Sequence, residues 1–185
     1  MLLPWHSTGG KIMPKKQIYL TGFMGTGKSM ILNCLHEVCG FDKIEMDEQI
    51  VQEQGMSIPE IFEKKGEEYF RNLETELVKK ISAMDNIVVS CGGGTVMRQC
   101  NVDEMKKNGT IVLLTAEPET VYERVKGSHN RPLLEKNMNP EYIKELMKAR
   151  RPKYEAAAEF VINTDNRTEE EICQEINKRR KTVDN

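Results

Sequence analysis

Residues 22–29 of this chain read Gly-Phe-Met-Gly-Thr-Gly-Lys-Ser and fit the pattern GxxxxGK[ST] at every specified position. Glycines in such a loop let successive backbone N–H groups turn inward around phosphate oxygens, and the positive end of a following helix adds attraction. Lys28 offers a mobile charge to the β- and γ-phosphates, and the Ser29 hydroxyl offers a ligand to Mg²⁺. The motif predicts binding of a nucleoside triphosphate. Because the sequence has no NKxD guanine-reading pattern, ATP is favoured over GTP.

Two carboxylates stand in Glu45-Met46-Asp47, at the end of the second expected strand. Side chains alternate between the faces of a strand, so residues two apart share a face. Paired acids beside a triphosphate can hold Mg²⁺-bound water and accept a proton from a hydroxyl group. The alternative is a pair of solvated acids that open a helix, since Asp47 is a good N-cap residue.

Three further features have both a chemical and a structural interpretation. Arg71 stands beside an apolar stripe with Glu74 one helical turn later, and is either a ligand-binding cation or half of a surface ion pair. The three glycines of residues 92–94 directly follow a β-rich run, and they either permit close approach of a ligand or form a structural turn. Arg150 continues an apolar helical stripe, and either faces inward or extends to the surface.

The elements that must position these residues follow an alternation of β-rich runs and helical patterns, which predicts a parallel α/β sheet. The expected strands are Gln17–Thr21, Lys43–Met46, Ile87–Ser90, Thr110–Leu114 and Phe160–Asn163. A helix between the first two strands, closed by Gly40, has the apolar stripe Ile31, Leu32, Leu35, Val38 and Cys39. A second helix is expected from about Glu67 to Met84, with the stripe Phe70, Leu73, Leu77, Ile81 and Met84. A third runs from Pro140 to Arg150, where Pro152 ends it, and a last helix opens with a capping box of Thr168 and Glu171 and buries Ile172 and Ile176.

The composition is that of one ordinary globular domain of 185 residues, with 38% apolar and 30% charged residues. A net charge of −2 gives no long-range attraction to nucleic acid or anionic membranes, and no apolar run approaches the roughly 18 residues that span a bilayer. The five cysteines contain no CxxC pair, which argues against a disulfide framework or a zinc site and favours a reducing cytoplasm. Cys91 is expected to be a small buried side chain and His36 a helix-surface residue, neither with a chemical role.

Two segments break the pattern. Residues 1–14 lack the basic start and apolar centre of a signal peptide and are expected to form a disordered tail. Residues 127–140 are polar, rich in turn formers and too long for a plain connection. This composition favours either a mobile lid at about residues 127–138 or a disordered insertion.

Taken together, the motifs resemble the shikimate kinases. The blocks that carry the resemblance occur in that family's order between about Lys16 and Lys178: GFMGTGKS, SIPEIFEKKGEEYFRNLE, the triple glycine, RPLL and ARRPKYEAAA. The resemblance implies ATP-dependent phosphorylation of the 3-hydroxyl of shikimate, a step of aromatic amino acid biosynthesis. It implies an α/β P-loop fold like that of nucleoside monophosphate kinases, with a five-stranded parallel sheet, helices on both faces and a mobile lid. Residues 15–185 would form this single kinase domain, as a cytoplasmic monomer.

The same resemblance assigns roles to individual residues. ATP would contact Gly25, Thr26, Gly27, Lys28, Ser29, Met30, Arg131 and Arg167. Arg131 would reach the phosphates from the lid, and Arg167 would lie near adenine. Shikimate would be held by Asp47, Arg71, Gly93 and Arg150, with the arginines facing its carboxylate. Ser29 would ligate Mg²⁺ directly and Glu45 through water. The catalytic groups would be Lys28, Asp47 and Arg131.

Two positions depart from the family's pattern: Glu45 stands where Asp is usual, and Met30 stands where Thr is common. Both bear on metal affinity and rate rather than on the identity of the acceptor. One alternative function is a P-loop kinase of another small acceptor such as gluconate or a nucleotide. The two separated arginines and the triple glycine favour shikimate over it. The other alternative is a nucleotide-binding switch without catalysis, against which Lys28, Ser29 and Asp47 are intact.

Overall fold

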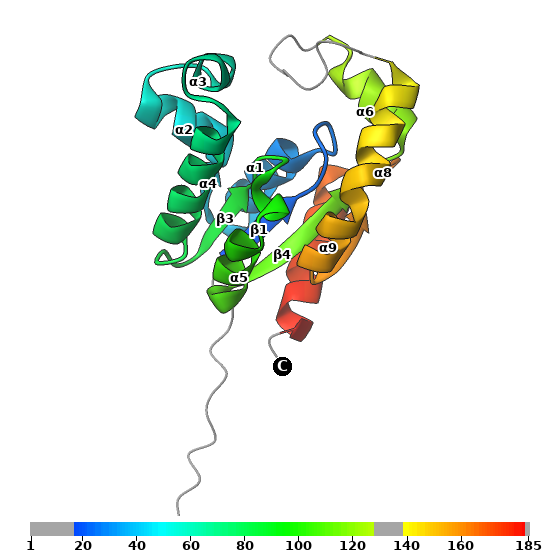
Figure 1. Ribbon diagram of the computed structural model, residues 1–185. Helices are drawn as coiled ribbons and strands as arrows, with labels where there is room; N and C mark the ends of the chain where they lie inside the picture. Colours follow the sequence, from blue (N-terminus) through cyan, green and yellow to red (C-terminus); the bar gives the residue numbers. More distant parts are fainter. Residues whose placement is uncertain (1–16, 128–138, 184–185) are drawn as a thin grey trace, which may run out of the picture.

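The computed structural model describes residues 17–127 and 139–183, without the side chains of the last two. The expected tail at residues 1–14 and nearly all of the expected lid lie outside the described residues. Five parallel strands form one sheet in the order β2-β3-β1-β4-β5 (Figure 1). Their bounds are Gln17–Thr21 for β1, Asp42–Glu45 for β2, Ile87–Ser90 for β3, Gly109–Thr115 for β4 and Phe160–Asn163 for β5. Because β1 is central, its residue Leu20 pairs with Ser90 on one side and Val112 on the other.

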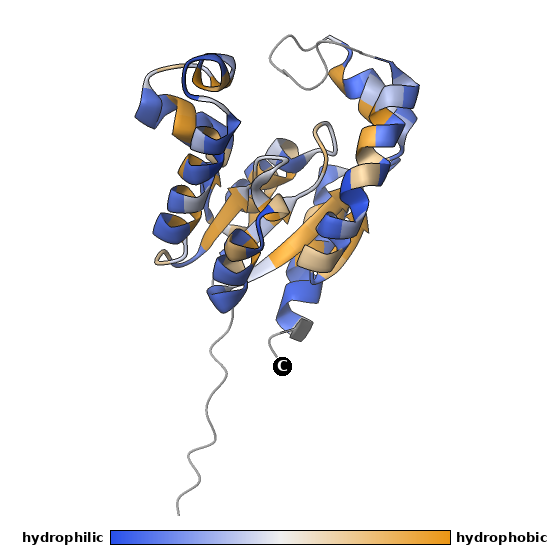
Figure 2. Cartoon of the chain, viewed as in Figure 1, coloured by the Kyte–Doolittle hydropathy of each residue, from blue (hydrophilic) through white to orange (hydrophobic). Residues whose placement is uncertain are grey.

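Helices cover both faces of the sheet, as the sequence predicts. They are α1 (Lys28–Cys39), α2 (Met46–Gln54), α3 (Ile58–Lys65), α4 (Glu67–Ile81), the 3-10 helix η1 (Thr95–Met97), α5 (Gln99–Asn108), α6 (Pro118–Val125), α8 (Pro140–Ala157) and α9 (Glu169–Val183). Alternate strand residues point to opposite faces. Tyr19 and Ile111 join the apolar cluster beneath α4, α5 and α8, whereas Leu20 and Val112 join the cluster beneath α1 and α9. Figure 2 shows this arrangement as apolar strands enclosed by helices whose outer faces are hydrophilic.

Most of the expected elements are confirmed, and β1, β3 and β5 have the expected bounds. The last helix begins with the expected capping box, in which the Glu171 N–H donates to Thr168 Oγ1 and the Thr168 N–H donates to Glu171 Oε2. Two residues that were expected on buried apolar stripes, Val38 and Met84, are exposed instead. Val38 is 67% exposed and lines a cavity between α1 and α9, and Met84 is 43% exposed because α4 ends three residues earlier.

The expected end of the third helix at Arg150 is also wrong. Pro152 lies inside α8, which continues to Ala157. Proline removes one backbone hydrogen bond from a helix interior and crowds the preceding turn. Burial of Tyr154 and Ala157, which are 4% and 3% exposed, offsets that cost and keeps the chain helical beyond the proline.

Candidate active site

The phosphate-binding loop connects β1 to α1 at the carboxyl edge of the sheet, where open α/β sheets bind ligands. Gly22 and Gly25 have φ values of +139° and +79°, which favour glycine. They are also closely packed: a Cβ on Gly22 would collide with the Leu114 carbonyl oxygen, and one on Gly25 would lie 2.7 Å from Val125 Cγ1 of α6. The loop is therefore shaped by contact with β4 and α6 as well as by its own sequence.

The side chains of the loop are turned toward its own backbone. Lys28 Nζ donates to the carbonyl oxygens of Gly22 at 3.1 Å and Phe23 at 3.0 Å, and Thr26 Oγ1 donates to Phe23 O at 2.8 Å. Gly27 precedes α1 with φ +95°, and the Met30 methyl lies 3.7 Å from where a Cβ on Gly27 would stand. Met30, 37% exposed, therefore lies against the loop.

Ser29 and Glu45 form the pair of oxygen ligands next to this loop. Ser29 Oγ donates to Glu45 Oε2 at 2.6 Å. Burial raises the pKa of Glu45, and the hydrogen bond from Ser29 opposes that rise. The expectation that Glu45 and Asp47 share one strand face is wrong, since β2 ends at Glu45 and Asp47 lies in the first turn of α2. A helix follows β2 at once, so the strand alternation stops before Asp47.

Arg71 and Glu74, both on α4, form a largely buried ion pair rather than a surface ion pair. Arg71 Nη1 donates to Glu74 Oε2 at 2.7 Å, and Glu74, 1% exposed, accepts a second bond from Thr95 Oγ1 at 2.7 Å. Burial raises the pKa of Glu74 despite the neighbouring guanidinium. Burial alone lowers the pKa of Arg71, but the carboxylates of Glu74 and Glu67 raise it on balance. The arginine is thus held as a cation with a fixed direction.

The three glycines after β3 bring the remaining groups together. A Cβ on Gly92 would lie 2.7 Å from Glu74 Oε1 and 2.8 Å from Asp47 Oδ1, and one on Gly94 would collide with the Arg71 guanidinium. On the far side, Arg150 Nη1 donates to Gly93 O at 3.4 Å. Arg150 is half-buried and directed at the turn, so it does not extend away to the surface. The turn is glycine-rich because charged side chains from three helices fill the space around it.

Three residues in this region were not predicted from the sequence. Glu74 was noted only as an ion-pair partner, and Tyr154, whose hydroxyl donates to Gly93 O at 2.6 Å, follows the proline that seemed to end the helix. Arg124 of α6 donates from Nη1 to the Gly25 carbonyl oxygen at 3.1 Å and to Thr164 Oγ1 at 3.3 Å. No sequence signal marks Arg124, because its contacts join residues about 100 and 40 positions away.

Two further residues, Arg167 and Arg131, were expected to contact the nucleotide. Arg167 lies in the turn between β5 and α9, and its Nη2 pairs with Glu175 Oε2 at 2.7 Å. Arg131 lies outside the described residues. Of the two residues expected to have no role, Cys91 is buried and His36 is half-buried, with Nδ1 2.6 Å from Phe41 O.

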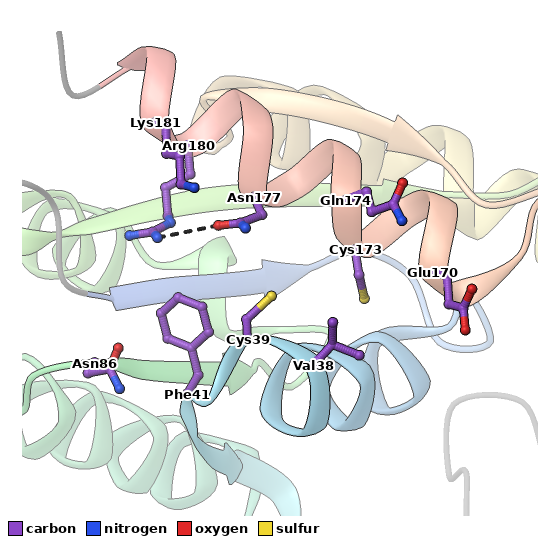
Figure 3. A pocket seen from close by; sticks show the side chains of 10 residues that line it. All are labelled: Val38, Cys39, Phe41, Asn86, Glu170, Cys173, Gln174, Asn177, Arg180 and Lys181. Carbon is purple, nitrogen blue, oxygen red and sulfur yellow. Dashed lines mark hydrogen bonds between the residues drawn. The ribbon is translucent and has the colours of Figure 1, made fainter.

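Among the described residues, one cavity borders this site and another lies away from it. One, of about 600 Å³, is bounded by the phosphate-binding loop at Phe23 and Thr26, by the end of β4 and by α8. The other, of about 460 Å³, lies between the last turn of α1 and α9 (Figure 3). This second cavity lies at the opposite end of α1 from Lys28, about 16 Å away along the helix axis. Its lining includes Val38, Cys39, Cys173 and Glu170, and it contains neither the phosphate-binding loop nor any of the residues expected to bind a substrate. The chemistry belongs at the carboxyl edge of the sheet.

The family model for shikimate kinase matches residues 24–181. The chain belongs to the shikimate kinase family. It is 42% identical over 170 residues to a shikimate kinase of Thermodesulfovibrio yellowstonii, covering 92% of this chain and 98% of that protein. It is 43% identical over 161 residues to one of Persephonella marina, covering 87% and 96%. The structure of an Acinetobacter baumannii shikimate kinase in complex with shikimate superposes with a TM-score of 0.83 at 32% identity, covering 88% of this chain and 91% of that one.

These comparisons confirm the predicted family, its class as an ATP phosphotransferase, and the predicted α/β fold with its five-stranded parallel sheet. Within the described residues, no helix has the length and apolar character needed to cross a lipid bilayer.

Proposed function

We propose that the protein transfers the γ-phosphoryl group of ATP to the 3-hydroxyl of shikimate, giving shikimate 3-phosphate and ADP. The observation that carries this proposal is the convergence of Asp47, Arg71 and Arg150 on one glycine turn, across the sheet edge from the phosphate-binding loop. Two guanidinium groups suit a planar carboxylate, which each can bind through paired N–H groups. A carboxylate beside them suits a hydroxyl group. The acceptor is thus a small hydroxylated acid, and the family makes it shikimate.

On the nucleotide side, Gly25, Thr26, Gly27 and Met30 would surround the phosphates, and Lys28 would exchange its two carbonyl contacts for phosphate oxygens. The Ser29 hydroxyl and the Glu45 carboxylate, 2.6 Å apart, are hard oxygen ligands of the kind that Mg²⁺ prefers. Ser29 would bind the ion directly and Glu45 would hold one of its waters. When bound, Mg²⁺ would neutralise part of the negative charge of the phosphates.

The protein's own part in the reaction is positioning and charge. The transition state of phosphoryl transfer is loose, so little proton removal is needed before the P–O bond breaks. Asp47 would orient the acceptor hydroxyl and take its proton as the new bond forms. Lys28 would stabilise charge on the transferred group, and Arg131 would do so from the segment outside the described residues.

Other parts of the proposal rest on the resemblance alone. Arg167 is proposed to lie near adenine. Arg124 is a second candidate for that position, on the separate ground that it contacts the phosphate-binding loop. The single kinase domain at residues 15–185, its lid, the monomeric state and the cytoplasmic location stay predictions.

The proposal is tested by measuring ADP release from ATP and Mg²⁺ with shikimate, quinate, gluconate and nucleoside monophosphates as acceptors. Shikimate should give the highest kcat/KM. A higher value with gluconate or a nucleotide would assign the protein to another kinase specificity, and no release with any acceptor would favour a nucleotide-binding switch.

A further inference from the structure

The Gly93 carbonyl oxygen receives two hydrogen bonds from the same helix. Tyr154 Oη donates to it at 2.6 Å, and Arg150 Nη1 donates at 3.4 Å. The first is a short, strong bond for a hydroxyl donor, and the second is at the long limit for a guanidinium donor. Arg150 and Tyr154 are four residues apart on α8, so they lie on the same helix face. The Gly93 carbonyl oxygen is therefore bound mainly by the tyrosine hydroxyl, and its hydrogen bond from the arginine is weak.

Tyr154 is built into the core behind the turn. It is 4% exposed, belongs to the apolar cluster beneath α8, and burial raises the pKa of its hydroxyl. The hydroxyl therefore stays protonated and donates steadily at neutral pH. Arg150 also interacts with this hydroxyl. Arg150 therefore contacts both the tyrosine hydroxyl and the carbonyl oxygen that this hydroxyl binds.

We propose that Tyr154 is a positioning residue for the acceptor, because by satisfying the Gly93 carbonyl it keeps Arg150 available for the acceptor's carboxylate. The proposal rests on the proposed function, in which Arg150 binds that carboxylate. A carbonyl oxygen in a partly buried turn needs a donor. Without the tyrosine hydroxyl, Arg150 Nη1 is the donor already in contact with Gly93 O among the described residues, and a charge-assisted bond to this oxygen would hold the guanidinium away from the ligand.

The test is a double-mutant cycle with Tyr154→Phe and Arg150→Ala, with shikimate affinity measured by calorimetry and kcat and both KM values measured by ADP release. Tyr154→Phe keeps the buried ring and removes only the hydroxyl. It should weaken shikimate binding about tenfold, leave the KM for ATP unchanged, and add less than about twofold in the Arg150→Ala background. This loss of effect is what a merely structural role cannot produce.

Tyr19→Phe is the matched control. Tyr19 is also fully buried, and its hydroxyl donates to Gln17 Oε1 at 3.0 Å, at the other end of the strand from the site. Thermal unfolding of both variants reports any general loss of stability, and Tyr19→Phe should leave shikimate affinity unchanged.

The outcomes separate the two proposals. If Arg150→Ala binds shikimate as tightly as the wild type, the role of Arg150 in the proposed function is wrong. If Arg150→Ala weakens binding while Tyr154→Phe has no effect, or has the same effect with and without Arg150, the positioning role of Tyr154 alone is overturned.

Discussion

The two halves of the site are built in different ways. The phosphate-binding loop is a single run of residues 22–29, and its ligand groups are mainly backbone N–H groups shaped by glycines. The acceptor side is assembled from residues 47, 71–74, 92–95 and 150–154, and its ligand groups are side chains. Backbone N–H groups can bind the phosphates of any nucleotide, whereas the side chains around the acceptor discriminate one acceptor from another. Substitutions should therefore affect the two substrates separately.

The largest expected effect separates the two acids that lie where the halves meet. Asp47→Asn should lower kcat about 10²–10⁴-fold if Asp47 serves as general base, and added Mg²⁺ should not restore it. Glu45→Gln should raise the Mg²⁺ requirement, and excess metal should restore much of the activity, because Glu45 contacts the Ser29 hydroxyl. Mg²⁺ titrations of kcat for both variants check this.

A loss near the lower end for Asp47→Asn would mean that Asp47 only orients the acceptor hydroxyl. Rescue of Asp47→Asn by metal without rescue of Glu45→Gln would mean that the two roles are reversed.

A smaller effect is expected from a methyl group placed in the acceptor turn. Gly94 has φ −105°, which an alanine adopts easily, but its Cβ would meet the Arg71 guanidinium. Gly94→Ala should therefore keep the fold, displace Arg71 and raise the KM for shikimate about tenfold. The KM for ATP should not change. In an Arg71→Ala background the same substitution should add little, and an equal effect there would show that the turn itself, not Arg71, is what the glycine protects.

The smallest effect concerns stability and pH. Burial raises the pKa of Glu74 above the 4.5 of an exposed carboxyl group. Its contribution to folding is then fully present below about pH 4.5 and is lost as pH rises through the folded-state pKa. The stability difference between the wild type and Glu74→Gln should shrink over that rise, as measured by urea unfolding at several pH values. Glu76→Gln, on the exposed side of α4, is the control. A difference that grows with pH would show that pairing with Arg71 dominates.

The same contrast explains what could be predicted from the sequence. The loop and the order of strands and helices were predictable because glycine pattern, apolar alternation and helix caps are local signals. The buried state of Glu74 was not, since it depends on Thr95 from another segment. Asp47 was expected to share the strand face of Glu45 because alternation cannot show where β2 ends. Tyr154 was missed because the local cost of Pro152 was taken as decisive, although burial beyond it was larger.

The central claim is that Arg71 and Arg150 bind the acceptor and not the nucleotide. Calorimetric titration of Arg71→Ala and Arg150→Ala with shikimate and with ATP tests it, with Arg151→Ala as control because Arg151 is exposed on α8 and pairs with Glu155. Each of the first two variants should lose about 1.5–3 kcal/mol of shikimate binding and retain its ATP affinity, since each loses a charge-assisted contact. Shikimate affinity that is unchanged in both variants, or ATP affinity that falls equally, would contradict the account.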